Sequence, residues 1–200
     1  MNYNLEPLWN EILKVYAEFA RICAKHGLRH YAAYGTAIGA VRHKGFIPWD
    51  DDFDVVMPRE DYEKFVAVAQ TELPSWLTVL SRRLQADYYH VFNKVKVIDD
   101  SVVRKVQALS NLDLSEGIYI DIFPLDGAPN SFLGRQCYWL QRWTYRALGI
   151  YLEGVKSYKH SLLWLIGWFM HFMHPDAKDG NDAMFLLENW AMRYKFSDSN

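Results

Sequence analysis

The stretch that most constrains this 200-residue chain is a run of acids that follows a Gly-Thr turn. Every residue from 50 to 54 is an aspartate except Phe53. A folded domain accommodates such dense like charge at low cost only in water or around a cation. The alternation of acids with Phe and Val predicts a strand that begins at Asp52. Asp52 and Asp54 then share one face and form a hard-cation site, with Mg²⁺ preferred and Mn²⁺ as the alternative.

A phosphate-binding element is expected just before the acids. Gly35 and Thr36 interrupt a short strand and open a helix. Glycine lets the backbone approach a ligand, the threonine hydroxyl caps the helix, and a helix N-terminus favours anions. His43 and Lys44 add positive charge between the turn and the acids. A cation, a helix N-terminus and a lysine are what a transferring phosphoryl group needs, so these four residues are assigned to phosphate or nucleotide binding.

A third carboxylate is expected on a second buried strand. Ile118, Ile120 and Ile122 face one way along it, so Asp121 faces the other way among aromatic residues. A buried acid without a partner costs several kcal/mol. Asp121 therefore binds metal, acts as a base, or pairs with a basic group.

These features resemble a known family. From residue 35 the chain reads Gly-Thr-x-x-Gly-Ala-Val-Arg-His-Lys-Gly-Phe-Ile-Pro-Trp-Asp-Asp-Asp-x-Asp-Val, and from residue 57 it reads Met-Pro-Arg-Glu-Asp-Tyr. This is similar to the signature of the LicD family of phosphocholine transferases, which are related to fukutin-type ribitol-phosphate transferases. Residues 94–96 and 117–127 are also similar to the family.

The resemblance implies a fold and a reaction. The fold is an α/β (α+β) nucleotidyltransferase-like one: a small mixed sheet flanked by helices, with a helix-rich C-terminal part. The reaction is transfer of a phospho-alcohol, phosphocholine first, from a CDP-alcohol such as CDP-choline to a hydroxyl of a cell-surface glycan, teichoic acid or lipopolysaccharide, with release of CMP. Asp52, Asp54 and Asp121 are then the metal ligands and catalytic residues, with Asp121 as third ligand or general base. Lys94 meets the phosphates; on an edge strand it would instead block aggregation.

Other interpretations remain open. A nucleotidyltransferase that moves NMP from an NTP to a small hydroxylated acceptor would use the same acids, although the seven residues from His43 to Trp49 argue against it. A calcium-binding loop would use Asp50, Asp52 and Asp54, but it lacks the glycine and glutamate of an EF-hand. An inactive family member is a further alternative. Arg59 either contacts substrate or pairs with a neighbouring glutamate.

The composition limits the class of partner and the cellular compartment that we expect for this protein. A net charge of −2 gives no general attraction to nucleic acid. Half of the residues are hydrophobic, as in a globular chain. The two cysteines, Cys23 and Cys137, are widely spaced, which favours a reducing compartment. The first eleven residues do not look like a signal peptide. We expect a cytoplasmic protein; the sequence does not set its oligomeric state.

The chain is expected to contain a catalytic core, residues 1–130, and a helical part of the same domain, residues 131–200. Family members usually run on, so we expect a shorter member or a truncated chain. The predicted helices are 5–26, 35–42, one beginning at Pro58, 132–150, 160–174 and 183–194, and the predicted strands include 28–34, 77–80 and 88–98. The apolar helix 160–174 is too short to span a bilayer. It is either a buried helix or an interfacial one, which would make the protein peripheral at the inner face of the cell membrane.

Overall fold

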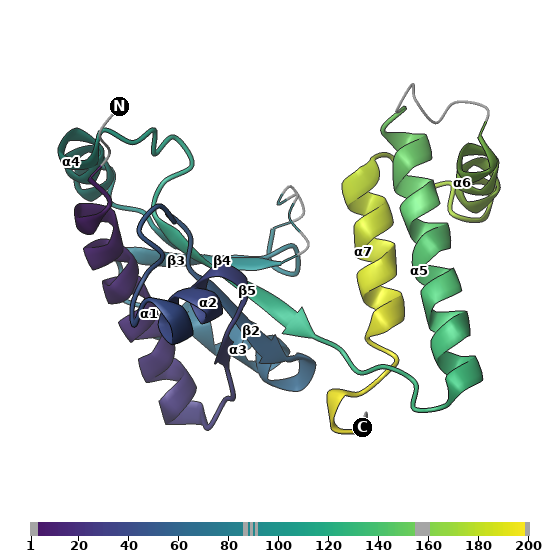
Figure 1. Ribbon diagram of the computed structural model, residues 1–200, viewed down its shortest axis with the longest axis horizontal. Coiled ribbons are helices and arrows are strands. Elements are labelled where there is room, and N and C mark those ends of the chain that lie inside the picture. Colours follow the sequence, from purple (N-terminus) through teal and green to yellow (C-terminus); the bar gives the residue numbers. More distant parts are fainter. Residues whose placement is uncertain (1–3, 86–87, 89, 91, 155–160, 199–200) are drawn as a thin grey trace. The chain divides into compact units, whose positions relative to one another are not determined.

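The protein is described by a computed structural model that covers residues 4–85, 88, 90, 92–154 and 161–198. The chain divides into two compact units (Figure 1). Unit 1 comprises Met1–Tyr88 and Phe92–Leu125, and unit 2 comprises Asp126–Asn200 with Tyr89–Val91. Unit 1 holds the sheet, and unit 2 is helical. Whether residues 1–130 and 131–200 form one domain stays a prediction.

Unit 1 is built on a five-stranded mixed sheet with the order β1-β2-β5-β4-β3. The strands are β1 (Tyr31–Ala32), β2 (Asp54–Pro58), β3 (Leu77–Leu80), β4 (Asn93–Val97) and β5 (Tyr119–Leu125). β2 and β5 run parallel, and the other neighbouring strands are antiparallel. This sheet and the helices around it confirm the predicted α/β class.

Four helices accompany the sheet in the described part of unit 1. They are α1 (Glu6–His26), α2 (Tyr34–Arg42), α3 (Arg59–Glu72) and α4 (Asp100–Ser110). α1 buries a stripe with helical spacing: Leu8, Ile12, Val15, Phe19, Ile22 and Cys23. The predicted helix 5–26 is confirmed, and it ends as expected because Gly27 adopts a φ of 64° at the cap.

One face of the sheet packs on α1 and α3 and forms the core of unit 1 (Figure 1). Alternate residues of the three central strands are buried on this face: Val55, Met57, Val95, Val97, Ile120 and Ile122. Side chains alternate along a strand, so the residues between them project from the opposite face. That opposite face carries Asp54, Lys94 and Asp121.

Several predicted boundaries differ from the structure. The strand 28–34 is reduced to Tyr31–Ala32, and the strand expected from Asp52 begins at Asp54. Pro124 lies in β5 opposite Met57 of β2. Its missing N–H is tolerated because the described pairing of β5 with β4 ends at Ile122, which leaves Pro124 on an edge. Part of the predicted strand 88–98 lies outside the described residues.

Helix α4 is an element that the sequence analysis did not assign. Asp99 caps it by accepting a hydrogen bond from the Ser101 N–H at 2.9 Å, and Asn111 ends it with a φ of 58°. Such caps are the sequence signal that could have located it. Its valines, Val102, Val103 and Val106, obscure the signal because β-branched residues also favour strands.

Unit 2 consists of α5 (Phe132–Leu152), α6 (Leu162–Met173) and α7 (Gly180–Ala191), followed by a short 3₁₀ turn, Phe196–Asp198. Each helix begins after a capping side chain that accepts a backbone hydrogen bond: Ser131, Ser161 and Asp179. A Cβ on Gly167 of α6 would clash with the backbone of α5 at Ala147, so these two helices are in close contact.

The predicted helices of unit 2 are confirmed with small shifts. The last one starts at Gly180 rather than at 183, because Asp179 caps it. His160, the expected start of the second helix, lies outside the described residues. Among the helices that the structure describes, none has both the length and the apolar character needed to cross a bilayer.

The core of unit 1 predicts the effect of a cavity. Ile120 is 0% exposed in the central strand. We expect Ile120→Ala to lower the free energy of unfolding by about 2–5 kcal/mol, because it removes buried methyl groups and leaves a void. Urea denaturation measures this change. Ile98→Ala is the control, since Ile98 is 52% exposed, and it should cost no more than about 0.5 kcal/mol. Equal losses in the two variants would contradict the placement of the core.

Candidate functional site

Three charged residues form a row across the face of the sheet that lies opposite the core. Asp54 of β2 is the register partner of Asp121 in β5, and Asp121 is in turn the partner of Lys94 in β4. Register partners on adjacent strands present their side chains side by side. The pairing of the sheet therefore brings together residues that are separated by 40 positions between Asp54 and Lys94 and by 27 between Lys94 and Asp121.

Asp121 is held beside a lysine in largely buried surroundings. Lys94 Nζ lies 3.6 Å from Asp121 Oδ1, an ion-pair separation that is longer than a hydrogen bond. In the described part of the chain, this buried Oδ1 has no hydrogen-bond partner. Lys94 Nζ also lies 3.4 Å from the centroid of the Tyr119 ring and 3.8 Å from Glu116 Oε2. Burial raises the pKa of Asp121 to about 7, with Lys94 opposing the shift and the neighbouring aspartates adding to it.

The other acids also have raised pKa values. Burial is the largest cause for Asp52 and Asp54, and the pKa of Asp54 reaches about 6. Repulsion adds to it: Asp52 and Asp50 raise the pKa of Asp54, while Asp51 and Asp50 raise that of Asp52. Half-buried carboxylates that repel one another lack a compensating charge, and a divalent cation supplies it.

The N-terminus of α2 is tied directly to the acid strand. The backbone N–H of Asp54 donates to Thr36 Oγ1 at 2.8 Å, and its carbonyl accepts from the Ala33 N–H at 3.0 Å. A Cβ at Gly35 would clash with the carboxylate of Asp50, so a larger residue here would require the Asp50 side chain to move. Tyr34 has a φ of 42°, a strained value for a non-glycine residue. The first turn of α2 therefore lies against the acid run.

Aromatic contacts anchor the loop that leads into the acids. The indole N–H of Trp9 donates to the Asp50 carbonyl at 2.8 Å. Trp9 stacks on Phe46 with ring centroids 5.1 Å apart, and Tyr16 packs on Phe53 at 4.8 Å. Trp9 and Tyr16 both belong to α1. The long N-terminal helix therefore holds the loop with the acid run in place and also packs on the sheet.

Three carboxylates of the acid run lie within reach of one ion. Asp50, Asp51 and Asp52 each offer an oxygen within 4.8 Å of the others. In the predicted set of Asp52, Asp54 and Asp121, the carboxylate oxygens are not all within 4.8 Å of one another. Asp52 belongs to both sets. The orphaned Asp121 Oδ1 and the repelling carboxylates fit a hard divalent cation, while the individual ligand roles stay predictions.

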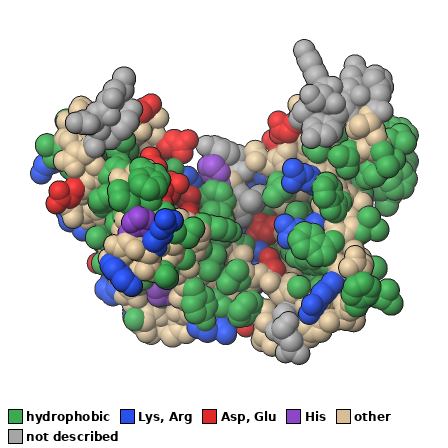
Figure 2. All heavy atoms as spheres, viewed as in Figure 1, with side chains coloured by type: hydrophobic (Ala, Val, Ile, Leu, Met, Phe, Trp, Pro, Cys, Tyr) green, Lys and Arg blue, Asp and Glu red, His purple; other side chains and the backbone are tan. Residues whose placement is uncertain are grey.

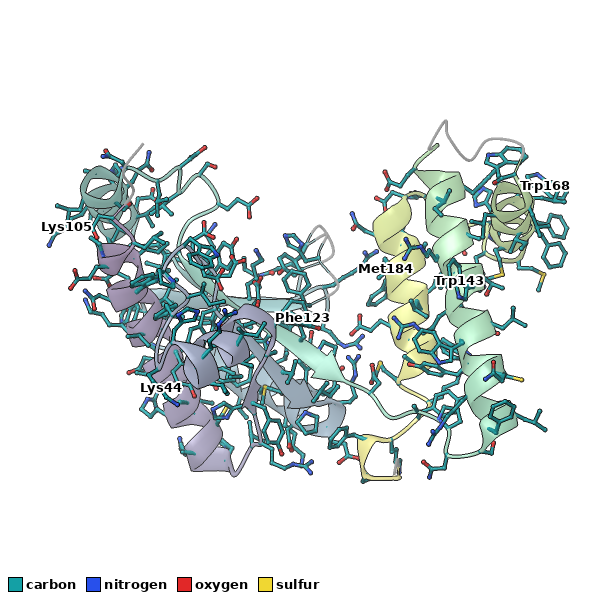
Figure 3. The ribbon with its side chains drawn as sticks, in the orientation of Figure 1. Lys44, Lys105, Phe123, Trp143, Trp168 and Met184 are labelled. Atoms are coloured by element: carbon teal, nitrogen blue, oxygen red, sulfur yellow. The ribbon has the colours of Figure 1, made fainter. Side chains whose placement is uncertain are left out.

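His43 and Lys44 are not brought to the same place as Gly35 and Thr36. His43 caps the C-terminal end of α2, about 10 Å along the helix axis from Thr36. Lys44 follows it with a φ of 59° and an exposed side chain (Figure 3). Of the five residues assigned to phosphate binding, the structure thus places Gly35, Thr36 and Lys94 near the acids; the roles of all five stay predictions.

Some neighbours of the site were not assigned from sequence. The unbroken acid run is the sequence signal for Asp50 and Asp51, but the sequence does not decide whether they are ligands. Glu116 and Tyr119, which contact Lys94, were not singled out at all. A cavity of about 220 Å³ opens beside these residues in unit 1. Its lining is Leu8, Ile12, Asp51, Asp52, Asp113, Leu114, Ser115, Glu116, Gly117, Ile118 and Tyr119.

The structure also decides two alternatives. The EF-hand interpretation is wrong, because residues 54–58 form strand β2 instead of a calcium loop. Arg59 is 6% exposed, and its guanidinium lies 3.3 Å from Glu63 and over the Tyr62 ring. These contacts favour a structural role for Arg59, the buried first residue of α3.

Comparison with known proteins places these features in a family. The lipopolysaccharide cholinephosphotransferase LicD of Haemophilus influenzae is 32% identical over 123 residues, which cover 59% of this chain and 43% of that relative. The match thus represents less than half the length of the relative. Uncharacterized proteins of Rickettsia prowazekii and Rickettsia typhi are each 42% identical over 40 residues, which cover 20% of this chain and 15% and 13% of theirs.

No solved structure matches the chain. A family model described as LicD/FKTN/FKRP, nucleotidyltransferase domain, matches residues 27–147, which is more than half of the chain. The matched range contains the first turn of α2, the acid run and the row of Asp54, Asp121 and Lys94. On this ground the resemblance seen in the sequence is confirmed: the chain belongs to the LicD/FKTN/FKRP nucleotidyltransferase-domain family.

Proposed function

We propose that this chain carries the active site of a divalent-cation-dependent transferase. It moves a phospho-alcohol, phosphocholine first, from a CDP-alcohol such as CDP-choline to a hydroxyl of a surface glycan and releases CMP. Lipopolysaccharide is the favoured acceptor, because the relative from Haemophilus influenzae carries that name, and teichoic acid is the second. Mg²⁺ is the proposed cation, with Mn²⁺ as the alternative.

The observation that carries this proposal is the row of Asp54, Asp121 and Lys94 beside the first turn of α2. The row places two carboxylates and one ammonium on an open sheet face. The adjoining helix N-terminus offers backbone N–H groups and a positive dipole to an anion. A diphosphate needs both: negative groups that hold a metal, and donors that hold its own oxygens.

The residues of the chain then have separate tasks. Gly35 and Thr36 orient a phosphate at the start of α2, and Lys94 adds a positive charge next to Asp121. When bound at the acid run, Mg²⁺ would offset the charge of the phosphates. The acceptor oxygen forms its bond to phosphorus as the bond from phosphorus to the CMP oxygen breaks. Asp121, with a pKa of about 7, is suited to take the proton of the acceptor hydroxyl near neutral pH.

Neutralising single acids tests the catalytic assignment. We expect Asp52→Asn, Asp54→Asn and Asp121→Asn each to reduce CMP release from CDP-choline by about 100-fold or more, because an amide keeps the shape but loses the charge. CMP is measured with Mg²⁺ and a glycan acceptor, and circular dichroism verifies the fold. Asp100→Asn, at an exposed site on α4, is the control and should keep the full rate. An Asp54→Asn variant with the wild-type rate would remove Asp54 from the mechanism.

Ligand-induced stabilisation separates this reaction from nucleotidyl transfer. A ligand that binds the native state raises the melting temperature. With Mg²⁺ present, we expect CDP-choline or another CDP-alcohol to raise it, and ATP and CTP to leave it unchanged. A shift with an NTP but not with any CDP-alcohol would favour the nucleotidyltransferase alternative. The same panel, read by CMP release, identifies which alcohol is transferred.

The raised pKa values predict how stability depends on pH without metal. Asp54 and Asp121 have folded-state pKa values of about 6 and about 7, above the ordinary value of 3.8. The folded state therefore binds protons more tightly than the unfolded state, so this stabilising contribution is complete at low pH and is lost as pH rises through 6 to 7. With EDTA present, we expect the melting temperature to fall from about pH 5 to about pH 8.

The double variant Asp54→Asn/Asp121→Asn is the matched control for this titration. Because it lacks both carboxylates, its melting temperature should show a shallower decline over the same pH range. Added Mg²⁺ should raise the melting temperature of the wild type most at the high-pH end, where the carboxylates are charged. Identical pH profiles for the wild type and the double variant would show that these acids titrate normally.

A further inference from the structure

Helix α6 exposes a broad apolar face. Six of its twelve residues are exposed hydrophobic side chains, which we call the α6 face: Leu162, Leu165, Trp168, Phe169, Phe172 and Met173. Their exposed fractions run from 49% for Trp168 to 74% for Phe172. The opposite side of the helix is packed on α5 through Gly167. Figure 2 shows hydrophobic side chains gathered over α6 at the right of the view.

This surface is too large and too aromatic to be an ordinary solvent-facing helix side. Single exposed hydrophobic residues are common, but contiguous apolar patches of several hundred Å² mark binding surfaces. α6 contains no Asp, Glu, Lys or Arg, so its exposed side has no charged residue of its own. Exposed Trp and Phe side chains suit the interfacial layer of a membrane, and the charged groups that an interfacial surface also carries have to come from outside α6.

Helix α5 adds basic groups next to tryptophans. Trp139, Arg142, Trp143 and Arg146 follow one another at helical spacing and border a cavity of about 180 Å³ with Met184 and Leu187 of α7. Figure 3 labels Trp143 and Met184. The guanidinium carbons of Arg142 and Arg146 lie 5.3 Å and 5.8 Å from the ring centroids of Trp139 and Trp143. Among the described residues, neither arginine has a carboxylate within ion-pair distance.

The positive charge of α5 and α6 indicates a negatively charged partner. α5 and α6 together contain three arginines and no aspartate or glutamate. The exposed Trp and Phe of α6 suit the apolar part of a lipid layer, and the guanidinium groups of α5, which lie on the side of that helix next to α7, complement anionic headgroups. A second copy of this chain would bring the same positive charge toward itself, which disfavours self-association through α5.

We propose that unit 2 binds the surface of an anionic phospholipid bilayer, with the α6 face in the interfacial layer and Arg142 and Arg146 in contact with lipid phosphates. This inference does not depend on the transferase proposal, because it rests on residues 132–191 alone.

Vesicle binding by the full chain tests the proposal. Vesicles of pure phosphatidylcholine and of phosphatidylcholine with phosphatidylglycerol are sedimented with the protein. We expect binding to the anionic vesicles, with a blue shift of tryptophan fluorescence, and weaker binding to neutral ones. Leu165→Gln/Phe172→Gln should weaken it by at least about tenfold, because two apolar side chains no longer insert. Both residues are more than half exposed, so the fold should be kept.

Matched variants in unit 1 control for general effects. Ile98→Gln/Leu109→Gln removes two similarly exposed apolar side chains and should bind like the wild type. Arg142→Gln/Arg146→Gln should lose binding to anionic vesicles by about tenfold and lose most of the salt dependence. The control for this arginine variant is Arg104→Gln/Lys105→Gln, which removes two basic side chains from α4 in unit 1. Figure 3 labels Lys105.

Three outcomes would overturn the proposal. Equal binding to neutral and anionic vesicles would remove the role of the arginines. Wild-type binding by both the α6 and the α5 variants would place the contact elsewhere in the chain. A dimer in sedimentation velocity that Leu165→Gln/Phe172→Gln dissociates, with no vesicle binding, would assign the α6 face to a second copy.

Discussion

The register of three neighbouring strands is the constraint on which the candidate site depends. β4, β5 and β2 align Lys94, Asp121 and Asp54 in one row, and a shift of one residue in either pairing would turn the side chains to the other face. That register is held by the core, because the residues before and after the row are buried against α1 and α3. Packing on one face of the sheet therefore sets the chemistry on the other.

The same arrangement creates the electrostatic character of the site. Asp121 is largely buried, is near two other aspartates and has a single ammonium at ion-pair distance. Burial raises the pKa values of these carboxylates, and their mutual repulsion, which one positive charge does not offset, raises them further. In the proposed mechanism such a site would gain stability from a divalent cation and would keep a carboxyl group able to exchange a proton near pH 7. The charge imbalance thus links the fold to the proposed reaction.

The two units divide the surface chemistry of the chain. Unit 1 gathers acids around an open sheet face, whereas α5 and α6 of unit 2 carry only arginines and apolar or neutral polar side chains. The division supports the two proposals separately, since each rests on its own unit.

The sequence by itself determined much of this protein. The periodic apolar residues located α1, α3 and α7, and a nearly continuous apolar run located α6. The unbroken acids marked the site and the Gly-Thr motif identified the family, because local patterns and short motifs are written in contiguous residues. Helix α4 was not predicted because its valines also favour strands. The edge position that lets β5 accept Pro124 is not visible in the sequence, because it depends on how β5 pairs with β4. Only the tertiary structure decided that Lys94 and Glu116 approach each other, that His43 lies at the far end of α2, and that the α6 face is exposed rather than buried. Such facts depend on strand pairing and helix packing between distant residues, which no local pattern encodes.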